Sequence, residues 1–289
     1  MAKGRELKGR IKSVENTRKI TRTMEMVATS KMKRAQDRVV SARPYANALT
    51  EVISSLYSPE LAERFPLLRQ VEQPKRVALV VLTSNRGLAG GFNANLIKEA
   101  RVRIAALEGA GAQVDVHVIG KKGIGYFRYV GRELASQRVD VTDRPTAENA
   151  AEIVDGLMAE YISGALDGVY VTYSKFNSVL STPPTTEKVL PVTPPETKEG
   201  QVQRDYLLFP SAEKILTELL PSYVRNSVYR ALVETVAGEQ SARRTAMKNA
   251  TDNAGDILNV LRRTYNRARQ AQITQEIAEI VGGAAALQG

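Results

Sequence analysis

Apolar residues recur at intervals of three and four along the C-terminal part of the chain, where proline is missing over a long distance. The 66 residues from Ser222 to Leu287 contain no proline. This pattern predicts one continuous α-helix of about 100 Å. A compact chain of 289 residues would have a radius of gyration of about 19 Å. Most of so long a helix therefore needs cover from another helix or from a partner protein.

The first 43 residues form a second stretch without proline. All twelve prolines lie between Pro44 and Pro221, and proline breaks helices because it has no backbone N–H. We therefore expect one helical arm at each end of the chain and a different structure between them. The apolar stripe of the N-terminal arm comprises Leu7, Ile11 and Val14, then Ile20, Met24, Val27 or Ala28, Met32, Ala35, Val39 and Ala42.

The C-terminal arm has apolar positions at a mean spacing of 3.5 residues, which favours a left-handed supercoil. We predict that the two arms form an antiparallel left-handed coiled coil. Helices of an ordinary bundle are the alternative, but the arms are unequal, at about 65 Å and about 100 Å. Pairing them leaves about 35 Å of single helix that needs a partner. The C-terminal positions are Met247, Ala250, Ala254, Ile257, Leu261, Tyr265 and Ala268.

The middle of the chain alternates between strand and helix patterns. Its order of elements predicts an α/β domain with a Rossmann-like, mostly parallel sheet. The chain would then divide into a coiled-coil shaft, residues 1–58 and 211–289, and an α/β foot domain, residues 75–210. After Phe176 a segment rich in proline and threonine reaches Tyr206 and predicts a hairpin or long loop. The expected strands are Lys75 to Ser84, Val114 to Gly120, Leu134 to Val141 and Val169 to Phe176, and the expected helices end near Glu108 and span Thr146 to Leu166.

Two glycine-rich turns follow predicted strands and raise the possibility of a nucleotide site. They are RGLAGG, residues 86–91, and GKKGIG, residues 120–125. Such turns can present backbone N–H groups to a phosphate. Neither matches a P-loop or a strict GxGxxG, and no acidic ribose partner follows about 20 residues later. We therefore expect tight strand-to-helix turns and no cofactor.

Composition removes most catalytic and metal chemistry. The chain has no cysteine, and His117 is its single histidine, so thiolate zinc sites, disulfides and Ser-His-Asp catalysis lack their usual residues. His117 shares a strand face with Asp115 and is expected to be solvated or hydrogen-bonded. Glu276 and Glu279 share a helix face, and we interpret them as solvated. We predict no catalytic residue and no metal ligand.

Positive charge is concentrated in the N-terminal arm. The net charge is +10, and residues 1–43 hold 13 Lys and Arg against 4 Asp and Glu. A basic helix can bind nucleic acid, an anionic membrane or an acidic protein surface. Residues 1–43 contain no aromatic side chain, which argues against nucleic acid. The longest aliphatic run, Val77 to Leu82, is too short to span a bilayer, and we expect a soluble chain without a secretory leader.

Three segments resemble the gamma subunit of F-type ATP synthases. They are RIKSVENTRKITRTMEMVATSKMKRAQ at residues 10–36, SNRGLAGGFN at residues 84–93, and MKNATDNA with YNRARQAQITQEIAEIVGGAAAL near the end. The resemblance covers both arms and the sheet domain, in the same order. The chain departs from the family at Ala89, where many members have cysteine, and in the length of the TPPETKEG loop.

The resemblance implies a rotor shaft without catalytic activity or cofactor. Its partners would be the hexamer of alpha and beta subunits, the epsilon subunit and the membrane c-ring, with one copy per complex and no nucleic acid. The complex would translocate protons at the cytoplasmic face of the bacterial plasma membrane. Because the shaft lacks threefold symmetry, it would favour a different conformation in each beta subunit.

The resemblance also implies particular contact residues. Beta-subunit loops would meet Met24, Arg243, Arg269, Gln270, Thr274 and Glu276. The tip inside the head would comprise Val281, Gly282, Gly283, Ala284 and Leu287. A basic coiled-coil protein that binds nucleic acid and a nucleotide-binding α/β enzyme remain the alternatives.

Overall fold

The computed structural model describes residues 2–56, 64–193 and 211–287, and side chains within them from residue 4 to residue 284. Two helices are far longer than the rest, α1 (Ala2–Leu56) and α6 (Ala212–Leu287). The chain divides into two compact units, and each long helix contributes to both. We call residues 1–28 with 243–289 the helix-pair unit, and residues 29–242 the sheet unit. The predicted division into shaft and foot is drawn by element type and stays a prediction.

The helix-pair unit consists of α1 and α6 running in opposite directions. The hydroxyls of Thr21 and Thr251 lie 2.8 Å apart. Arg262 donates a hydrogen bond of 2.5 Å to Glu15, so residues earlier in α1 lie beside residues later in α6. This confirms the antiparallel pairing of the two arms, while the left-handed supercoil stays a prediction.

The residues through which α1 and α6 contact each other, here called the contact line, differ from the predicted apolar stripes at a few positions. At each of these the buried residue is a sequence neighbour of the predicted one. Ile20 is 60% exposed and Ile257 is 51% exposed, so their placement in the stripe was wrong. Thr21 and Thr251 are buried instead, at 9% and 8%, and Leu258 is 2% exposed. A strict seven-residue repeat through Val14, Thr21 and Ala28 explains the difference. Threonine at a contact position conceals this repeat from a search for apolar residues.

Both long helices continue through a proline, so the proline-free arms were too short. Pro44 lies inside α1 and Pro221 inside α6. An interior proline costs about 3 kcal/mol because it removes a helical hydrogen bond. Buried neighbours such as Ile53 and Leu220, each at most 2% exposed, offset that cost, since each buried aliphatic side chain contributes about 1.5–3 kcal/mol.

The end of α6 extends beyond its partner helix. Every described residue from Ile273 to Ala284 is exposed, and the helix continues to Leu287. These last 15 residues of α6 span about 22 Å. The overhang is therefore real but shorter than the predicted 35 Å or so.

The sheet unit is built on five strands in the order β3-β2-β1-β4-β5. The first four run parallel, and β5 is antiparallel to β4, which confirms the mostly parallel α/β class. The predicted hairpin or long loop after Phe176 contains β5, and β3 is shorter than expected. The strands are β1 (Arg76–Leu82), β2 (Gln113–Ile119), β3 (Ser136–Arg138), β4 (Gly168–Ser174) and β5 (Pro184–Leu190).

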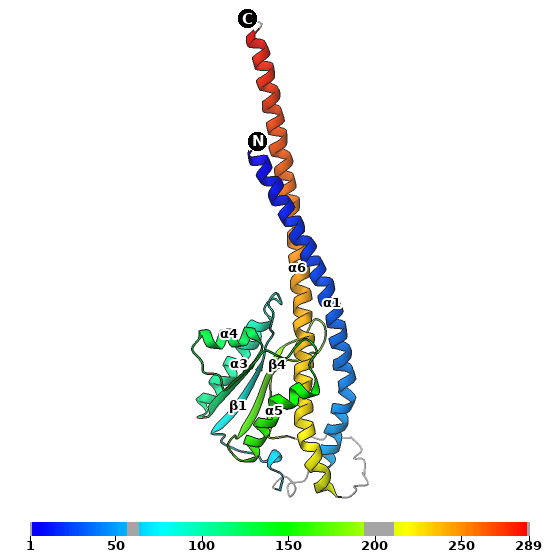
Figure 1. Cartoon of the computed structure of the whole chain (residues 1–289), viewed down its shortest axis with the longest axis vertical. Helices are drawn as coiled ribbons and strands as arrows, with labels where there is room; N and C mark the ends of the chain where they lie inside the picture. The colour runs from blue at the N-terminus through cyan, green and yellow to red at the C-terminus, as the bar shows by residue number, and fades with distance from the viewer. Residues whose placement is uncertain (1, 57–63, 194–210, 288–289) are drawn as a thin grey trace. The chain divides into compact units, whose positions relative to one another are not determined.

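Both faces of this sheet are covered, which explains the unbroken apolar run of β1. Val77, Leu79 and Val81 pack on the side of α3 (Phe92–Gly109) and α4 (Lys121–Tyr129). The alternate β1 residues pack on the side of α5 (Ala147–Ile162) and of α6. Figure 1 shows these helices on the two faces of the sheet. A short 3₁₀ turn, η1 (Pro66–Leu68), adds two buried leucines to the second core.

Within the sheet unit, α6 lies between the sheet and α1. Ala35 and Val39 of α1 share a cluster with Val233 and Ala237 of α6. All eight residues from Ala231 to Gly238 are buried. A helix covered on every side loses its amphipathic pattern, so this stretch is held by the sheet and α1 together.

The GKKGIG segment begins with a tight strand-to-helix turn at Gly120, between the end of β2 at Ile119 and the start of α4 at Lys121, as its sequence predicts. Gly120 has φ of +100°, and a Cβ there would lie 2.1 Å from the carbonyl oxygen of Thr83. The Thr83 hydroxyl donates to the carbonyl of Ile119 at 2.8 Å and accepts the Gly123 N–H at 3.0 Å. The turn's backbone is therefore held against the end of β1.

We expect Gly120→Ala to lower the free energy of unfolding by about 3 kcal/mol or more, because the methyl group meets backbone at a positive φ. Gly125→Ala is the matched control, since nothing lies within 4 Å of its added Cβ. That control should raise stability by about 0.5–1 kcal/mol within α4. Urea unfolding followed by circular dichroism measures both, and equal effects would contradict the close contact.

The corrected contact line predicts opposite behaviour for two adjacent residues of α6. Leu258→Ala should destabilise the helix pair by about 2–4 kcal/mol, because it empties a buried position. Ile257→Ala should cost less than about 1 kcal/mol, since its side chain is half exposed and alanine favours helix. Hydrogen exchange of α1 amides reports pairing directly. Faster exchange in the Ile257 variant than in the Leu258 variant would show that Ile257, as first predicted, is the residue that contacts α1.

Candidate interaction surfaces

Exposed basic side chains gather on the helix-pair unit. This unit holds 15 Lys and Arg against 7 Asp and Glu. Glu15 pairs with Arg262 and Glu6 pairs with Arg10, which neutralises part of the charge. Such a surface suits an acidic partner. We call its exposed cations near the start of α1 and along α6 the basic collar: Lys8, Arg10, Lys12, Arg262, Arg263, Arg267 and Arg269.

The overhang of α6 is apolar on one face and carries no basic side chain. No Lys or Arg follows Arg269. Its apolar stripe consists of Ile273, Ile277, Ile280 and Val281, which are 46%, 56%, 71% and 62% exposed. Four neighbouring aliphatic side chains on one exposed helix face indicate an interaction surface rather than scattered exposure. The overhang therefore presents an apolar face next to the basic collar.

The sequence-predicted site residues fall into two groups. Arg269, Gln270, Thr274 and Glu276 are exposed near the end of α6, and Glu276 accepts a hydrogen bond of 2.9 Å from Gln272. The residues of the expected tip, Val281, Gly282, Gly283 and Ala284, are exposed as well.

The other predicted residues are less accessible. Met24 is half-buried on α1, and Arg243 is buried at 9%. The side chain of Leu287 lies outside the described residues. The structure thus places most predicted residues on one accessible helix end, and their contacts with a partner stay predictions.

Sequence reasoning missed the isoleucines of the apolar stripe as a functional group. Ile273, Ile277 and Ile280 recur at intervals of four and three residues, which is the signal of a buried helix face. Their significance emerges only when α1 is seen to stop short of them. The spacing was visible in the sequence, whereas the missing partner helix was not.

The crevice where parallel sheets usually hold a ligand is occupied by α6. In this strand order the crevice lies at the carboxyl ends of β1 and β4. A Cβ on Gly238 would lie 2.3 Å from the hydroxyl oxygen of Ser174 and 3.4 Å from the Phe92 ring. Ala242 packs against the cluster that contains Phe92 and Leu96. Helix α6 therefore packs against the carboxyl end of β4 and the start of α3, where parallel sheets of this kind commonly hold a phosphate.

Arg230 and Glu234 of α6 form a charged cluster with Glu187 of β5. Arg230 donates to Glu187 of β5 at 2.8 Å and lies 3.8 Å from Glu234. Burial raises the pKa of the Glu234 carboxyl, and the Phe176 N–H and Arg230 oppose this only in part. Burial would also raise the pKa of Glu187, but Tyr173 and the charges of Arg230 and Lys175 outweigh it and hold that pKa below its ordinary value. The two carboxylates therefore differ in proton affinity.

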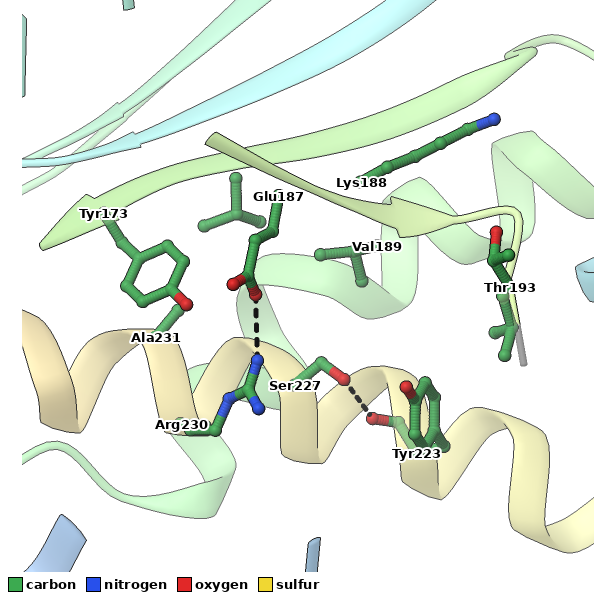
Figure 2. A pocket seen from close by; sticks show the side chains of 11 residues that line it. Tyr173, Glu187, Lys188, Val189, Thr193, Tyr223, Ser227, Arg230 and Ala231 are labelled. Carbon is green, nitrogen blue, oxygen red and sulfur yellow. Dashed lines mark hydrogen bonds and ion pairs between the residues drawn. The ribbon is translucent and has the colours of Figure 1, made fainter. Parts of the chain in front are cut away.

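A small cavity lies beside this cluster, and Figure 2 shows its lining. Its volume is about 70 Å³, below the 300–1,000 Å³ or so of typical small-molecule sites. The hydroxyl of Tyr173 is buried beside Glu187, and burial together with the neighbouring carboxylate raises its pKa strongly. The cavity is too small for a nucleotide.

The described residues contain no group of three or more His, Cys, Asp or Glu placed to hold a metal ion. None of the described helices is both long and apolar enough to cross a bilayer. His117 lies 2.7 Å from the Ser136 hydroxyl through its Nδ1, and burial lowers its pKa. This confirms a hydrogen-bonded strand histidine.

Comparison with known proteins gives one consistent result. The family model described as ATP synthase matches residues 3–287. An ATP synthase gamma chain of Gemmatimonas aurantiaca is 70% identical over 100% of both chains. The gamma chain of Pelotomaculum thermopropionicum is 44% identical over 98% of this chain and 99% of that protein.

Solved structures show the same fold. The central stalk and c-ring structure of the Tetrahymena thermophila mitochondrial ATP synthase contains a chain that is 27% identical, with a TM-score of 0.61 over 80% of this chain and 99% of its own length. A chain in the rotor of the Euglena gracilis enzyme is 18% identical, with a TM-score of 0.66 over 94% of this chain and 99% of its own. With a full-length family match and a 70% identical relative, the chain belongs to the ATP synthase gamma chain family.

Proposed function

We propose that this chain is the rotary central-stalk subunit of a proton-translocating F-type ATP synthase. It transmits torque between the membrane rotor ring and the catalytic sites of the beta subunits. The observation that carries the proposal is the 70% identity to a gamma chain along the full length. The unpaired end of α6 supports it, because such a surface requires a partner.

The chemistry of the helix-pair unit fits a shaft held inside a ring of subunits. The basic collar would face acidic loops of the beta subunits, and complementary charge there gives an energy that depends on orientation. Beta-subunit loops would also meet Met24, Arg243, Gln270, Thr274 and Glu276. The overhang would run in an apolar sleeve of the alpha and beta subunits. One asymmetric shaft thereby favours a different conformation in each beta subunit.

The remaining assignments follow from this role. The chain is non-catalytic by itself, with the epsilon subunit and c-ring as further partners and one copy per complex. The complex lies at the cytoplasmic face of the bacterial plasma membrane. Residues 1–58 and 211–289 act as the shaft and residues 75–210 as the foot. The filled crevice beside Gly238 supports the non-catalytic role, because it removes the usual nucleotide position of this fold.

We expect the purified chain to show no ATP hydrolysis and to restore rotation-coupled turnover to a hexamer of alpha and beta subunits. A phosphate-release assay on the chain alone and on the mixture measures both. Robust hydrolysis by the isolated chain would contradict the proposal. Tight DNA binding that weakens steeply with salt would favour the nucleic-acid alternative.

The apolar stripe predicts a sharp difference between neighbouring positions of the overhang. Ile277→Gln should weaken binding to the hexamer by about tenfold, since burial of one isoleucine contributes about 1.5–3 kcal/mol. Ala278→Gln introduces the same side chain on another face and should change binding by less than about threefold. Titration of labelled hexamer compares the two, and equal weakening would show that the stripe is not the contact face.

A further inference from the structure

The buried stretch of α6 makes directional bonds to the backbone at the end of β4. The Glu234 carboxylate accepts the Phe176 N–H at 2.9 Å. The Thr235 hydroxyl accepts the Ser174 N–H at 3.4 Å, and the Ser241 hydroxyl donates to the Val179 carbonyl. Three side chains of one helix thus hold backbone groups between residues 174 and 179.

Two further contacts fix the same helix face. Arg230 reaches from α6 to Glu187 of β5, as Figure 2 shows, and Lys175 pairs with the other carboxylate oxygen of Glu187 at 3.1 Å. Gly238 lets the helix backbone approach Ser174 so closely that a methyl group would lie 2.3 Å from its hydroxyl oxygen. We call Arg230, Glu234, Thr235, Gly238 and Ser241 the helix lock.

The lock resists rotation of α6 about its own axis in a way that apolar packing does not. Hydrophobic burial is non-directional and depends on area, so aliphatic contacts alone specify the rotation of a helix less strictly than hydrogen bonds do. Hydrogen bonds need short distances and good angles. A small turn of α6 would break the bonds to Phe176 and Ser174 and leave buried N–H groups unpaired, which is costly.

We infer that Glu234 and Thr235 are positioning residues for torque transfer, holding α6 at a fixed rotation against the end of β4. The inference rests on the proposed rotary function. Torque applied to the sheet then enters the shaft helix through the backbone N–H groups of residues 174 and 176. The apolar cores hold α6 against the sheet, and the helix lock prevents α6 from rotating relative to the sheet.

A buried carboxylate is the signal that sets this position apart. Glu234 is 7% exposed and Thr235 is 6% exposed, inside a stretch of α6 whose other residues from Ala231 to Gly238 are apolar or glycine. Acidic residues are almost never buried without a partner. An aliphatic side chain would suffice for packing alone. The polar pair is therefore explained by directional bonding to the sheet.

The test measures torsional stiffness in the assembled, rotating complex. A probe on the sheet unit reports the angular spread during a catalytic dwell, and this spread widens as the elastic coupling between foot and shaft weakens. Glu234→Ala removes the acceptor of the Phe176 N–H and should widen the angular variance by about twofold. Glu234→Gln keeps an acceptor oxygen and should restore the wild-type variance. Glu218→Ala, at an exposed carboxylate of the same helix, should leave it unchanged.

Thr235→Val serves where the Glu234 variant fails to assemble, because it keeps the shape of the side chain and removes the hydroxyl that accepts the Ser174 N–H. It should widen the variance in the same direction and lower the melting temperature modestly, because the buried Ser174 N–H loses its acceptor. Unchanged variance in an assembled Glu234→Ala or Thr235→Val complex would overturn the lock. Absence of rotation in the wild-type complex would instead overturn the proposed function, so the two failures are distinct.

Discussion

The placement of α6 between the sheet and α1 is the constraint on which the rest of the sheet unit depends. Eight consecutive residues of α6, starting at Ala231, are buried, so the sheet and α1 both pack against this helix. Gly238 makes this possible, because any larger residue would collide with Ser174. The same contact closes the crevice that related folds use for ligands. In this chain the strand ends that often hold ligands in parallel sheets hold a helix instead.

Much of this architecture could be predicted from apolar spacing. The long helices and four of the strands carry strong periodic patterns, and β1 is an unbroken apolar run because both of its faces are covered. Three features escaped for physical reasons. Helices α1 and α6 pass through Pro44 and Pro221, since tertiary packing outweighs one lost hydrogen bond. The contact line passes through threonines, and β5 (Pro184–Leu190) lies in a segment rich in proline and threonine that predicted only a hairpin or long loop.

The candidate surfaces were predictable to different degrees. Charge counts located the α1 part of the basic collar, within residues 1–43, because exposed Lys and Arg in a helix remain solvated wherever the helix packs. The helix lock could not be found this way, since its partners are backbone groups that carry no sequence signature. A single glutamate in an apolar stretch was its only trace. Its meaning depends on which strand end lies opposite, and only the three-dimensional structure supplies that.

The unpaired end of α6 has a consequence for how the chain enters its assembly. Isolated helices shorter than about 12–15 residues are marginal in water, and glycine lowers helix stability by about 1 kcal/mol per residue. The overhang is 15 residues long and contains Gly282 and Gly283. Its helical form is therefore only marginally stable in the free chain, and in the proposed assembly contacts with the surrounding subunits would stabilise it. Insertion would couple helix formation to binding, so the last turns would be completed by the partner rather than by the chain itself.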